Sequence, residues 1–382
     1  MLKIKTSCGS CSLCELIRLP YAEQLRLKHD EFRSILNGVN APILPFLPSP
    51  KKSRFRNKLI LPLQRRKGRL CMGFYKPGTH EIMEFRDCHI QDGRLAQAAL
   101  AVKGVLEKFP LDIYDEKKHS GLLRHLFLRS SSATGRIQAA FIASGRPCPE
   151  INKIAHQLKS EFRRKGLHAS GLLWNVNEKR TNVILGDREY IVFGKPKLEE
   201  KILGLDFEVS LSAFLQTNPG MAERMYKKVQ EFLDLQADHC GLDLYCGIGS
   251  MTLPLAKMAK RVTGIDSAES SIRDARHNAR LNGIKNAEFL CLDLDREAPP
   301  ATKKIDFVVA DPPRQGLSGL VMKFLNSRKV KKIVYVSCNP ASLRRDLMLL
   351  QEGGYAIKAI QPVDMFPHTK HIESVALLEY PG

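Results

Sequence analysis

The sequence predicts two domains: a basic α+β domain in the N-terminal half and a doubly wound, Rossmann-like α/β domain in the C-terminal half. From about residue 220, short apolar stretches alternate with helical stretches, which is the pattern of a parallel sheet covered by helices. Residues 1–200 hold 36 lysines and arginines against 19 acidic residues, whereas residues 201–382 hold 24 against 21. We therefore expect domains at 1–205 and 206–382 that do different jobs.

The N-terminal half opens with a cysteine run and an amphipathic helix over residues 20–36, which Asn37-Gly38 ends. A proline-rich linker follows at 41–50. The most basic segment spans residues 51–69 and overlaps a strand-like stretch at 59–63; a second lies at 71–75. A helix is expected at 95–109. Residues 121–194 alternate strand and helix signals and end in predicted strands at 181–185 and 189–193.

The C-terminal half repeats a strand–helix pattern. We expect helices at residues 222–235, 250–259, 269–282, 317–325 and 341–350. Apolar strands are expected at 241–245, 261–265, 287–290, 305–310 and 332–336, with 355–362 and 374–378 closing the series. This regular alternation is the reason for assigning a doubly wound sheet.

Composition and charge narrow the function. A hydrophobic content of 43% with 26% charged residues indicates a folded chain, not a disordered one. The net charge of +20 favours a polyanionic partner, either nucleic acid or an anionic membrane surface. A solvated basic surface that only aids solubility is the alternative. No apolar run is long enough to span a bilayer and the N-terminus lacks a signal-peptide core, so we expect a cytoplasmic protein with no membrane partner.

A glycine-rich turn stands between a predicted strand and helix. Gly247 and Gly249 form a G-x-G turn without the third glycine of the dinucleotide fingerprint. Asp266, Asp293 and Asp311 follow the next predicted strands, and ligands bind at such strand ends. This layout resembles that of S-adenosylmethionine-dependent methyltransferases. A nicotinamide dehydrogenase is the competing interpretation, and the missing glycine and the basic half disfavour it.

Cys338 comes directly after the predicted strand at 332–336, at the same sheet edge as the glycine turn. A buried structural thiol is the plainer interpretation. A thiolate here could instead add to C6 of a pyrimidine and make C5 nucleophilic, after which the C5 proton must be removed so that sulfur can leave. Glu373, just before the last predicted strand, is the candidate base, although an isolated glutamate would be read as a surface residue.

These features together resemble the RNA uracil-5-methyltransferase family, whose members act on 23S rRNA or on the T-loop of tRNA. The matching stretches cover nearly the whole chain and include Asp243-Leu-Tyr-Cys-Gly-Ile-Gly249, Asp311-Pro-Pro-Arg-Gln-Gly316, Ser337-Cys-Asn339 and Asp364-Met-Phe-Pro-His-Thr369 through Glu373. Further matches are Tyr21-Ala-Glu-Gln-Leu, Phe55-Arg-Asn-Lys58, Asn175-Val-Asn with Thr181-Asn-Val-Ile-Leu-Gly, and Phe214-Leu-Gln-Thr-Asn-Pro219.

The resemblance implies residue roles. The nucleophile falls on Cys338 and the base on Glu373. The cofactor and target-base positions fall on Gln216, Tyr245, Ser250, Asp266, Asp293 and Asp311, with Gly247 and Gly249 in the turn. Asp266 stands where many members carry glutamate, and the shorter side chain should still reach a ribose hydroxyl.

The resemblance also implies the substrate. The chain starts at its cysteine run without the extra N-terminal β-barrel of some members, which favours the shorter rRNA-type enzymes and a uridine of 23S rRNA. A tRNA uridine is the alternative. An RNA cytosine-5 methyltransferase is disfavoured by the signature around Glu373. A non-catalytic RNA-binding iron–sulfur protein is disfavoured by the intact Cys338, Glu373 and glycine turn. We expect a monomer.

Cys8, Cys11 and Cys14 form a C-x2-C-x2-C run among the ten cysteines of the chain. Three thiolates at this spacing with a distant fourth suit an iron–sulfur cluster. By resemblance to the family's [4Fe–4S] pattern, Cys88 is the fourth ligand and Cys71 its rival; Cys8 is the least certain of the run. Zinc would take the same ligands. A structural role, pinning the N-terminus to the basic domain, is expected.

The basic segment 51–69 is the expected phosphate track for RNA. Phe55 and Phe74 could stack on bases, although burial in the core is the expected fate of both. Because C5 and C6 of a uracil are hidden by stacking in folded RNA, the enzyme must move its target base out of the stack into a pocket. A loop or bulge is therefore the expected target.

Overall fold

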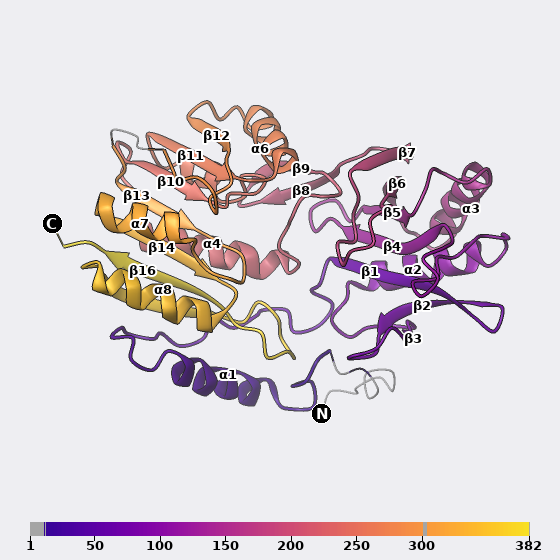
Figure 1. Cartoon of the computed structure of the whole chain (residues 1–382), viewed down its shortest axis with the longest axis horizontal. Coiled ribbons are helices and arrows are strands. Elements are labelled where there is room, and N and C mark those ends of the chain that lie inside the picture. Colours follow the sequence, from indigo (N-terminus) through magenta and orange to yellow (C-terminus); the bar gives the residue numbers. More distant parts are fainter. Residues whose placement is uncertain (1–10, 12, 301–303, 382) are drawn as a thin grey trace. The chain divides into compact units, whose positions relative to one another are not determined.

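The structure, a computed structural model, describes residues 11, 13–300 and 304–381 (Figure 1). The chain divides into two compact units. The first contains Ser53–Lys201 and Glu208–Ser212 as well as the described residues up to Leu13, and the second contains Cys14–Lys52, Ile202–Phe207 and the chain from Ala213 onward. The division therefore differs from the single boundary expected near residue 205, because the N-terminal helix and linker belong to the C-terminal unit.

The first unit is a mixed sheet with helices packed against it. Its strands lie in the order β3 (Ile82–Glu84), β2 (Arg69–Tyr75), β1 (Lys58–Arg66), β4 (Leu123–Ser130), β5 (Ile137–Ala143), β6 (Ala169–Val176) and β7 (Arg188–Gly194). Neighbours are antiparallel except β5 and β6. Helices α2 (Gly93–Leu106) and α3 (Ile151–Arg164) share one apolar core with the sheet, which gives the expected α+β arrangement.

One predicted strand of this unit is absent. Residues 181–185 read as β-rich, but in the structure they form bends and irregular chain between β6 and β7. The Asn177 amide nitrogen donates to the carbonyls of Val183 and Ile184, at 2.6 and 3.0 Å. A side chain therefore satisfies the backbone groups that a neighbouring strand would otherwise pair with. The predicted strand at 189–193 is confirmed as β7.

The second unit is the doubly wound sheet. Its strands lie in the order β12 (Ala287–Cys291), β11 (Arg261–Asp266), β10 (Cys240–Leu244), β13 (Phe307–Ala310), β14 (Lys332–Ser337), β16 (Glu373–Glu379) and β15 (Ala356–Val363). Strands β10 to β14 are parallel, as expected. Strand β16 is antiparallel to both β14 and β15. The loop that joins β15 to β16 is too short for a crossover, so these two strands must be antiparallel.

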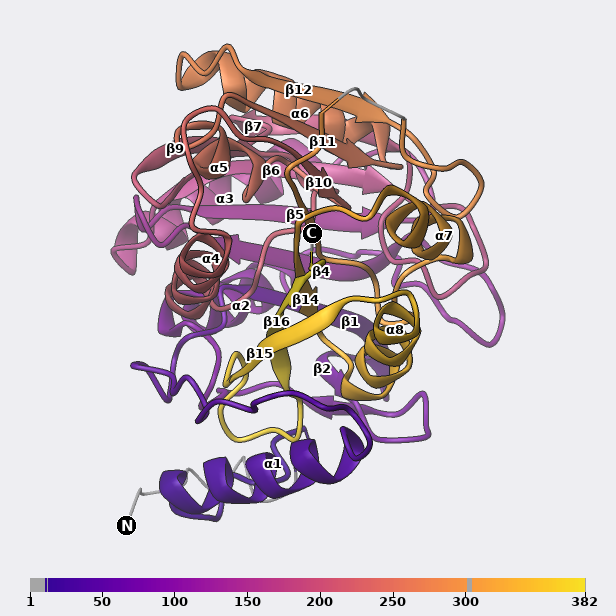
Figure 2. The ribbon, with the colours of Figure 1, turned by 90° about the vertical axis from the view of Figure 1, so that its left-hand side faces the viewer.

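Helices cover both faces of this sheet. Figure 2 shows α4 (Pro219–Leu233) and α5 (Thr252–Ala256) on one side and α7 (Gly319–Arg328) and α8 (Pro340–Glu352) on the other. Helix α6 (Glu269–Leu281) packs against β11 and β12. Helix α5 is shorter than the predicted 250–259, because Pro254 has no N–H to bond the carbonyl of Ser250 and so cannot extend the helix backward.

The N-terminal segment completes the second unit. Helix α1 (Tyr21–Ile35) buries Phe32 in the same apolar cluster as Leu343 and Leu347 of α8. The linker then runs beside β15, where Ile43 and Leu47 form isolated parallel bridges with Ile360 and Val363. This pairing explains why the segment belongs with the C-terminal fold. Among the described residues, no helix has the length and apolar character needed to cross a membrane.

Candidate active site

The predicted site residues of the second unit meet at one edge of its sheet. Tyr245 follows β10, Asp266 is the last residue of β11, Asp311 follows β13 and Cys338 follows β14. Because these strands are parallel, their carboxyl ends lie at the same edge. Strand β10 has β11 on one side and β13 on the other, so the chain changes winding direction here, which is where such sheets bind ligands.

The glycine turn is backed by a carboxylate. Tyr245, Gly247 and Gly249 all have positive φ, at 65°, 55° and 82°. The Asp266 carboxylate accepts hydrogen bonds from the N–H of Gly247 at 2.9 Å and of Ala268 at 2.8 Å. A Cβ on Gly247 would meet nothing within 4 Å, which leaves open space above the turn for a ligand. A carboxylate has about four acceptor positions, so Asp266 can still bind ribose hydroxyls.

Two further acids make this edge attractive to a cation. Asp243 is fully buried, and the Thr252 hydroxyl donates to its Oδ2 at 2.5 Å while its Oδ1 has no hydrogen-bond partner. Burial raises the pKa of Asp243 to about 7, and burial together with Asp243 raises the pKa of Asp311 to about 7. A bound cation would favour the ionised forms. The positively charged sulfonium group of S-adenosylmethionine would suit a site with these two carboxyl groups.

The register of β14 and β16 brings the predicted catalytic pair together. Ser337 pairs with Ser374 across the antiparallel strands, so Cys338 and Glu373 occupy neighbouring positions at the sheet edge. Cys338 is half-buried, and Glu373 is only 6% exposed. The two residues therefore reach the same edge from opposite strand directions, because β14 ends there and β16 begins there.

Burial and neighbouring charges shift the pKa values of Cys338 and Glu373. Burial, then Glu373 and Asp311, raise the pKa of the Cys338 thiol to about 11. Burial and Asp311 raise the pKa of Glu373 to about 8. The Arg314 guanidinium lowers both pKa values. Two carboxyl groups and one guanidinium therefore act on the thiol, and the Cys338 thiol and the Glu373 carboxyl group are both mainly protonated near neutral pH.

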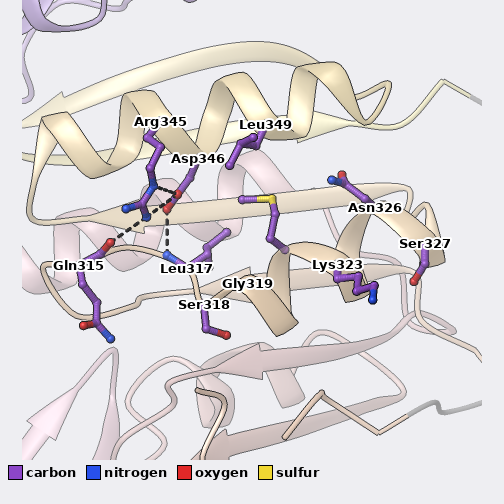
Figure 3. A pocket seen from close by; sticks show the side chains of 11 residues that line it. Gln315, Leu317, Ser318, Gly319, Lys323, Asn326, Ser327, Arg345, Asp346 and Leu349 are labelled. Atoms are coloured by element: carbon purple, nitrogen blue, oxygen red, sulfur yellow. Dashed lines mark hydrogen bonds and ion pairs between the residues drawn. The ribbon is translucent and has the colours of Figure 1, made fainter. Parts of the chain in front are cut away.

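The loop that carries Asp311 and Arg314 is fixed by α8. The Asn339 amide nitrogen donates to the carbonyl of Arg314 at 2.9 Å. The buried Asp346 accepts from Leu317 N–H at 2.8 Å and from the Tyr335 hydroxyl at 2.6 Å. Figure 3 shows Asp346 with Arg345 beside a pocket of about 930 Å³ between α7 and α8. The predicted catalytic pair is not among the residues that line this pocket.

The remaining predicted cofactor residues also lie in the second unit. Gln216 is buried just before α4, and Ser250 Oγ lies 3.4 Å from the Tyr226 hydroxyl. Asp293 lies two residues beyond β12, where its Oδ1 accepts from Asp295 N–H. Asp293 is therefore an acid beyond the end of β12, the strand at one edge of the sheet.

Of the four predicted metal ligands, the structure describes three, and these three do not form a metal site. Cys8 lies outside the described residues. Cys11, Cys14 and Cys88 are all half-buried, as is the rival ligand Cys71. Within the described part of the chain, no three His, Cys, Asp or Glu side chains come close enough together to hold a metal ion. The described residues alone therefore do not form the expected cluster site.

The basic segment divides into a structural part and an exposed part. Arg54 pairs with Asp87 at 2.7 Å, Phe55 is buried, and burial lowers the pKa of Lys58 to about 8. Lys51 and Lys52 are exposed at the start of the segment, and the other exposed cations lie at the tip of the β1–β2 hairpin. With Lys103 of α2, the tip lines a cavity of about 950 Å³ whose lining includes Arg65, Arg66, Lys67, Arg69, Leu106, Phe109 and Leu111.

Sequence reasoning missed several residues of the site. Arg314 stood in a quoted motif together with Asp311, which was the available signal, and Asp243 stood in the quoted glycine-turn motif directly before the turn. Lys28 of α1 is buried against Asp364, at 2.6 Å. A lysine in an amphipathic helix is normally solvent-facing, so no signal in the sequence could have found this contact.

Comparison with known proteins agrees with this geometry. The family model described as tRNA (uracil-5-)-methyltransferase matches residues 20–380. An RNA methyltransferase of Oceanobacillus iheyensis, described as uncharacterized, is 36% identical over 376 residues, which are 96% of this chain and 81% of the relative. A Clostridium tetani protein with the same description is 35% identical over 385 residues, which are 99% of this chain and 82% of that protein.

Among solved structures, the chain is similar to the tRNA (uracil-54, C5)-methyltransferase of Pyrococcus abyssi, which was crystallised in complex with S-adenosyl-L-homocysteine. The TM-score is 0.78 with 31% sequence identity, and the match covers 96% of this chain and 85% of the archaeal enzyme. The similarity therefore extends over both units and not only over the doubly wound sheet.

Proposed function

Because the chain belongs to the tRNA (uracil-5-)-methyltransferase family and is an S-adenosylmethionine-dependent RNA (uracil-5-)-methyltransferase, we propose that it methylates C5 of one specific uridine through a covalent Cys338–C6 intermediate. The observation that supports the intermediate most is the register of β14 and β16, which puts Cys338 and Glu373 at neighbouring positions.

In the proposed mechanism the Cys338 thiol first loses its proton to solvent, and the resulting thiolate adds to C6 and pushes electron density onto C5. Arg314 favours the thiolate because it lowers the thiol pKa. S-adenosylmethionine, when bound over the glycine turn, supplies an electrophilic methyl group. Glu373 in its carboxylate form, which Arg314 favours by lowering the glutamate pKa, then takes the proton from C5. The electron pair of that C–H bond re-forms the C5–C6 double bond while the C6–S bond breaks and returns its pair to sulfur.

We propose that Gln216, Tyr245, Gly247, Gly249, Ser250, Asp266, Asp293 and Asp311 bind the cofactor and the target base. The open space at Gly247 and the partly buried acids of the strand ends support this assignment. Calorimetry should detect S-adenosylmethionine binding that is sharply weakened in Asp266→Ala. Binding of NADH in its place would contradict the assignment.

The proposed substrate is a uridine of 23S rRNA, reached in the cytoplasm by a monomeric enzyme. The alternative is a tRNA uridine, which the similarity to an archaeal enzyme for tRNA uracil-54 favours. The test is mass spectrometry of nucleosides from 23S rRNA and from tRNA, each incubated with the protein and S-adenosylmethionine. New 5-methyluridine in one RNA identifies the substrate. 5-Methylcytidine, or no methylated pyrimidine in either RNA, would overturn the proposed reaction.

We propose that the hairpin tip contacts RNA phosphates. Lys67 and Gly68 form a two-residue turn with φ of 48° and 79°, which places Lys67 and Arg69 on the exposed end of the hairpin. Arg65 donates to the carbonyls of Gly68 and Leu111, and Arg66 pairs with Glu81, so these two arginines stabilise the tip. The cations of the tip line the same cavity as Phe109, together with Glu84 and Glu107, and cations beside an aromatic ring suit a nucleotide.

The cysteine spacing continues to support a [4Fe–4S] cluster as a proposal, with Cys8, Cys11, Cys14 and Cys88 as ligands. Its proposed role is structural, and no step of the methyl transfer depends on it.

A further inference from the structure

The loop at residues 364–372 joins β15 to β16 and ends at Glu373. Lys28 of α1 reaches this loop from the other end of the chain. Its Nζ donates to Asp364 Oδ1 at 2.6 Å, to the carbonyl of Phe366 at 3.1 Å and to the carbonyl of His371 at 3.1 Å. Asp364 directly follows β15 and His371 lies two residues before Glu373, so one ammonium group ties together both ends of the loop.

The rest of the helix face continues this contact. Tyr21, Gln24 and Lys28 lie three and four residues apart, on one side of α1. The Tyr21 hydroxyl donates to Asp364 Oδ2 at 2.7 Å and accepts from Ser49 N–H at 2.8 Å. Both carboxylate oxygens of Asp364 are thus held by α1.

Gln24 holds the middle of the loop. Its Oε1 accepts from His368 N–H at 2.9 Å, and its Nε2 lies 3.1 Å from His368 Nδ1. The carbonyl of His368 accepts from Leu16 N–H at 2.9 Å. His368 has φ of 71°, a left-handed conformation that costs energy for a residue with a side chain, and it is buried. The contacts from the N-terminal segment therefore stabilise a loop conformation that includes a costly left-handed residue.

Lys28 holds the loop at a cost in folding free energy, because its charge is buried. Lys28 and Asp364 are each only 1% exposed, and taking both charges out of water costs more than packing apolar side chains of similar size. Burial lowers the pKa of Lys28 while Asp364 raises it. What an apolar residue could not supply is a donor for the carbonyls on both arms of the loop.

We propose that Lys28 is a positioning residue for proton abstraction: it holds loop 364–372 in the conformation that presents Glu373 beside Cys338. This inference rests on the proposed role of Glu373. A shift of about 1 Å in a reacting group can cost about 100-fold in rate. Because Cys338 directly follows β14 and is not part of this loop, loss of Lys28 should slow the last step and spare sulfur addition and methyl transfer.

The test is Lys28→Met in the full chain, with methyl-labelled S-adenosylmethionine and the RNA that the wild type methylates. We expect product release to be about 10–100-fold slower in single turnover. A labelled protein–RNA adduct that survives denaturation should accumulate, with S-adenosylmethionine affinity unchanged. Arg26→Gln is the matched control, since Arg26 lies on the exposed face of the same helix and should turn over normally.

Asp364→Asn is the second variant, because it keeps the shape of the pair and removes its charge. Adduct accumulation in Lys28→Met supports the inference, and the same result in Asp364→Asn shows that the charge of the pair is needed. It is overturned if folded Lys28→Met turns over like wild type, or if both variants lose adduct formation and turnover together, which would indicate a merely structural role. A wild type that methylates no uridine would overturn the proposed function itself, before any variant is compared.

Discussion

The Glu373 carboxyl group is nearly excluded from water. In the proposed reaction it acts only after methyl transfer, so changing it should affect the last step alone. Glu373→Gln should still allow Cys338 to add to C6 and the methyl group to arrive. Without a base the C5 proton stays and sulfur cannot leave, so turnover should fall by at least about 100-fold. A methyl-labelled protein–RNA adduct should then persist on a denaturing gel.

Cys338→Ala is the control for this trap, because it should bind RNA and form no adduct. Fast, complete turnover by Glu373→Gln without a trapped adduct would remove Glu373 from the role of base. His371, two residues earlier, would then be the first residue to test.

The same carboxyl group should destabilise the folded protein as pH rises. Its pKa is about 8 when folded, against 4.5 for an ordinary glutamate. A raised pKa gives stability that is complete below pH 4.5 and is lost as pH rises through about 8. Glu373→Gln removes this loss, so the variant should gain on the order of 2 kcal/mol over wild type between pH 5 and pH 8.

Thermal unfolding midpoints at pH 5 and pH 8 measure this difference. The gap between Glu373→Gln and wild type should widen by a few degrees at the higher pH. Glu352→Gln, at the exposed end of α8, is the control and should show no such widening. An equal gap at both pH values would mean that Glu373 ionises as easily in the folded protein as in the unfolded chain.

At the scale of single elements, the β1–β2 hairpin has a testable role in RNA binding. Lys67→Asn with Arg69→Gln removes two exposed cations, and asparagine tolerates the left-handed backbone at position 67. Each lost phosphate contact should reduce the slope of log affinity against log salt by about 0.7–0.9. RNA binding measured at several salt concentrations should therefore show a slope shallower by about 1.5.

The exposed pair Lys117 and Lys118 provides a charge-matched control in the same unit. Changing both to glutamine removes the same charge away from the hairpin cavity, and the salt slope should stay close to that of wild type. Equal slopes for the two double variants would mean that RNA responds to the overall charge of this unit and not to the hairpin tip.

At the scale of the whole molecule, local patterns predicted the elements but not the long-range contacts. Strand–helix alternation and strand-end acids were enough to place Asp266, Asp311 and Cys338 at one sheet edge, because parallel strands share their carboxyl ends. The contact between α1 and loop 364–372 joins residues 336 positions apart in sequence for Lys28 and Asp364. No periodicity in the sequence encodes such a pair. The hairpin tip could not be distinguished either, because basic residues occur throughout segment 51–69.

The proposed iron–sulfur cluster takes its ligands from two parts of the chain that are distant in sequence, residues 8–14 and position 88. Protein purified without oxygen should be brown and carry about four irons per chain, as a [4Fe–4S] cluster requires. Cys88→Ser should lose most of the iron, while Cys71→Ser, which is equally half-buried, should keep it. The reverse result would exchange the fourth ligand. Colourless protein with one zinc would keep the thiolates as ligands and exclude the iron–sulfur cluster, since zinc also accepts four thiolates.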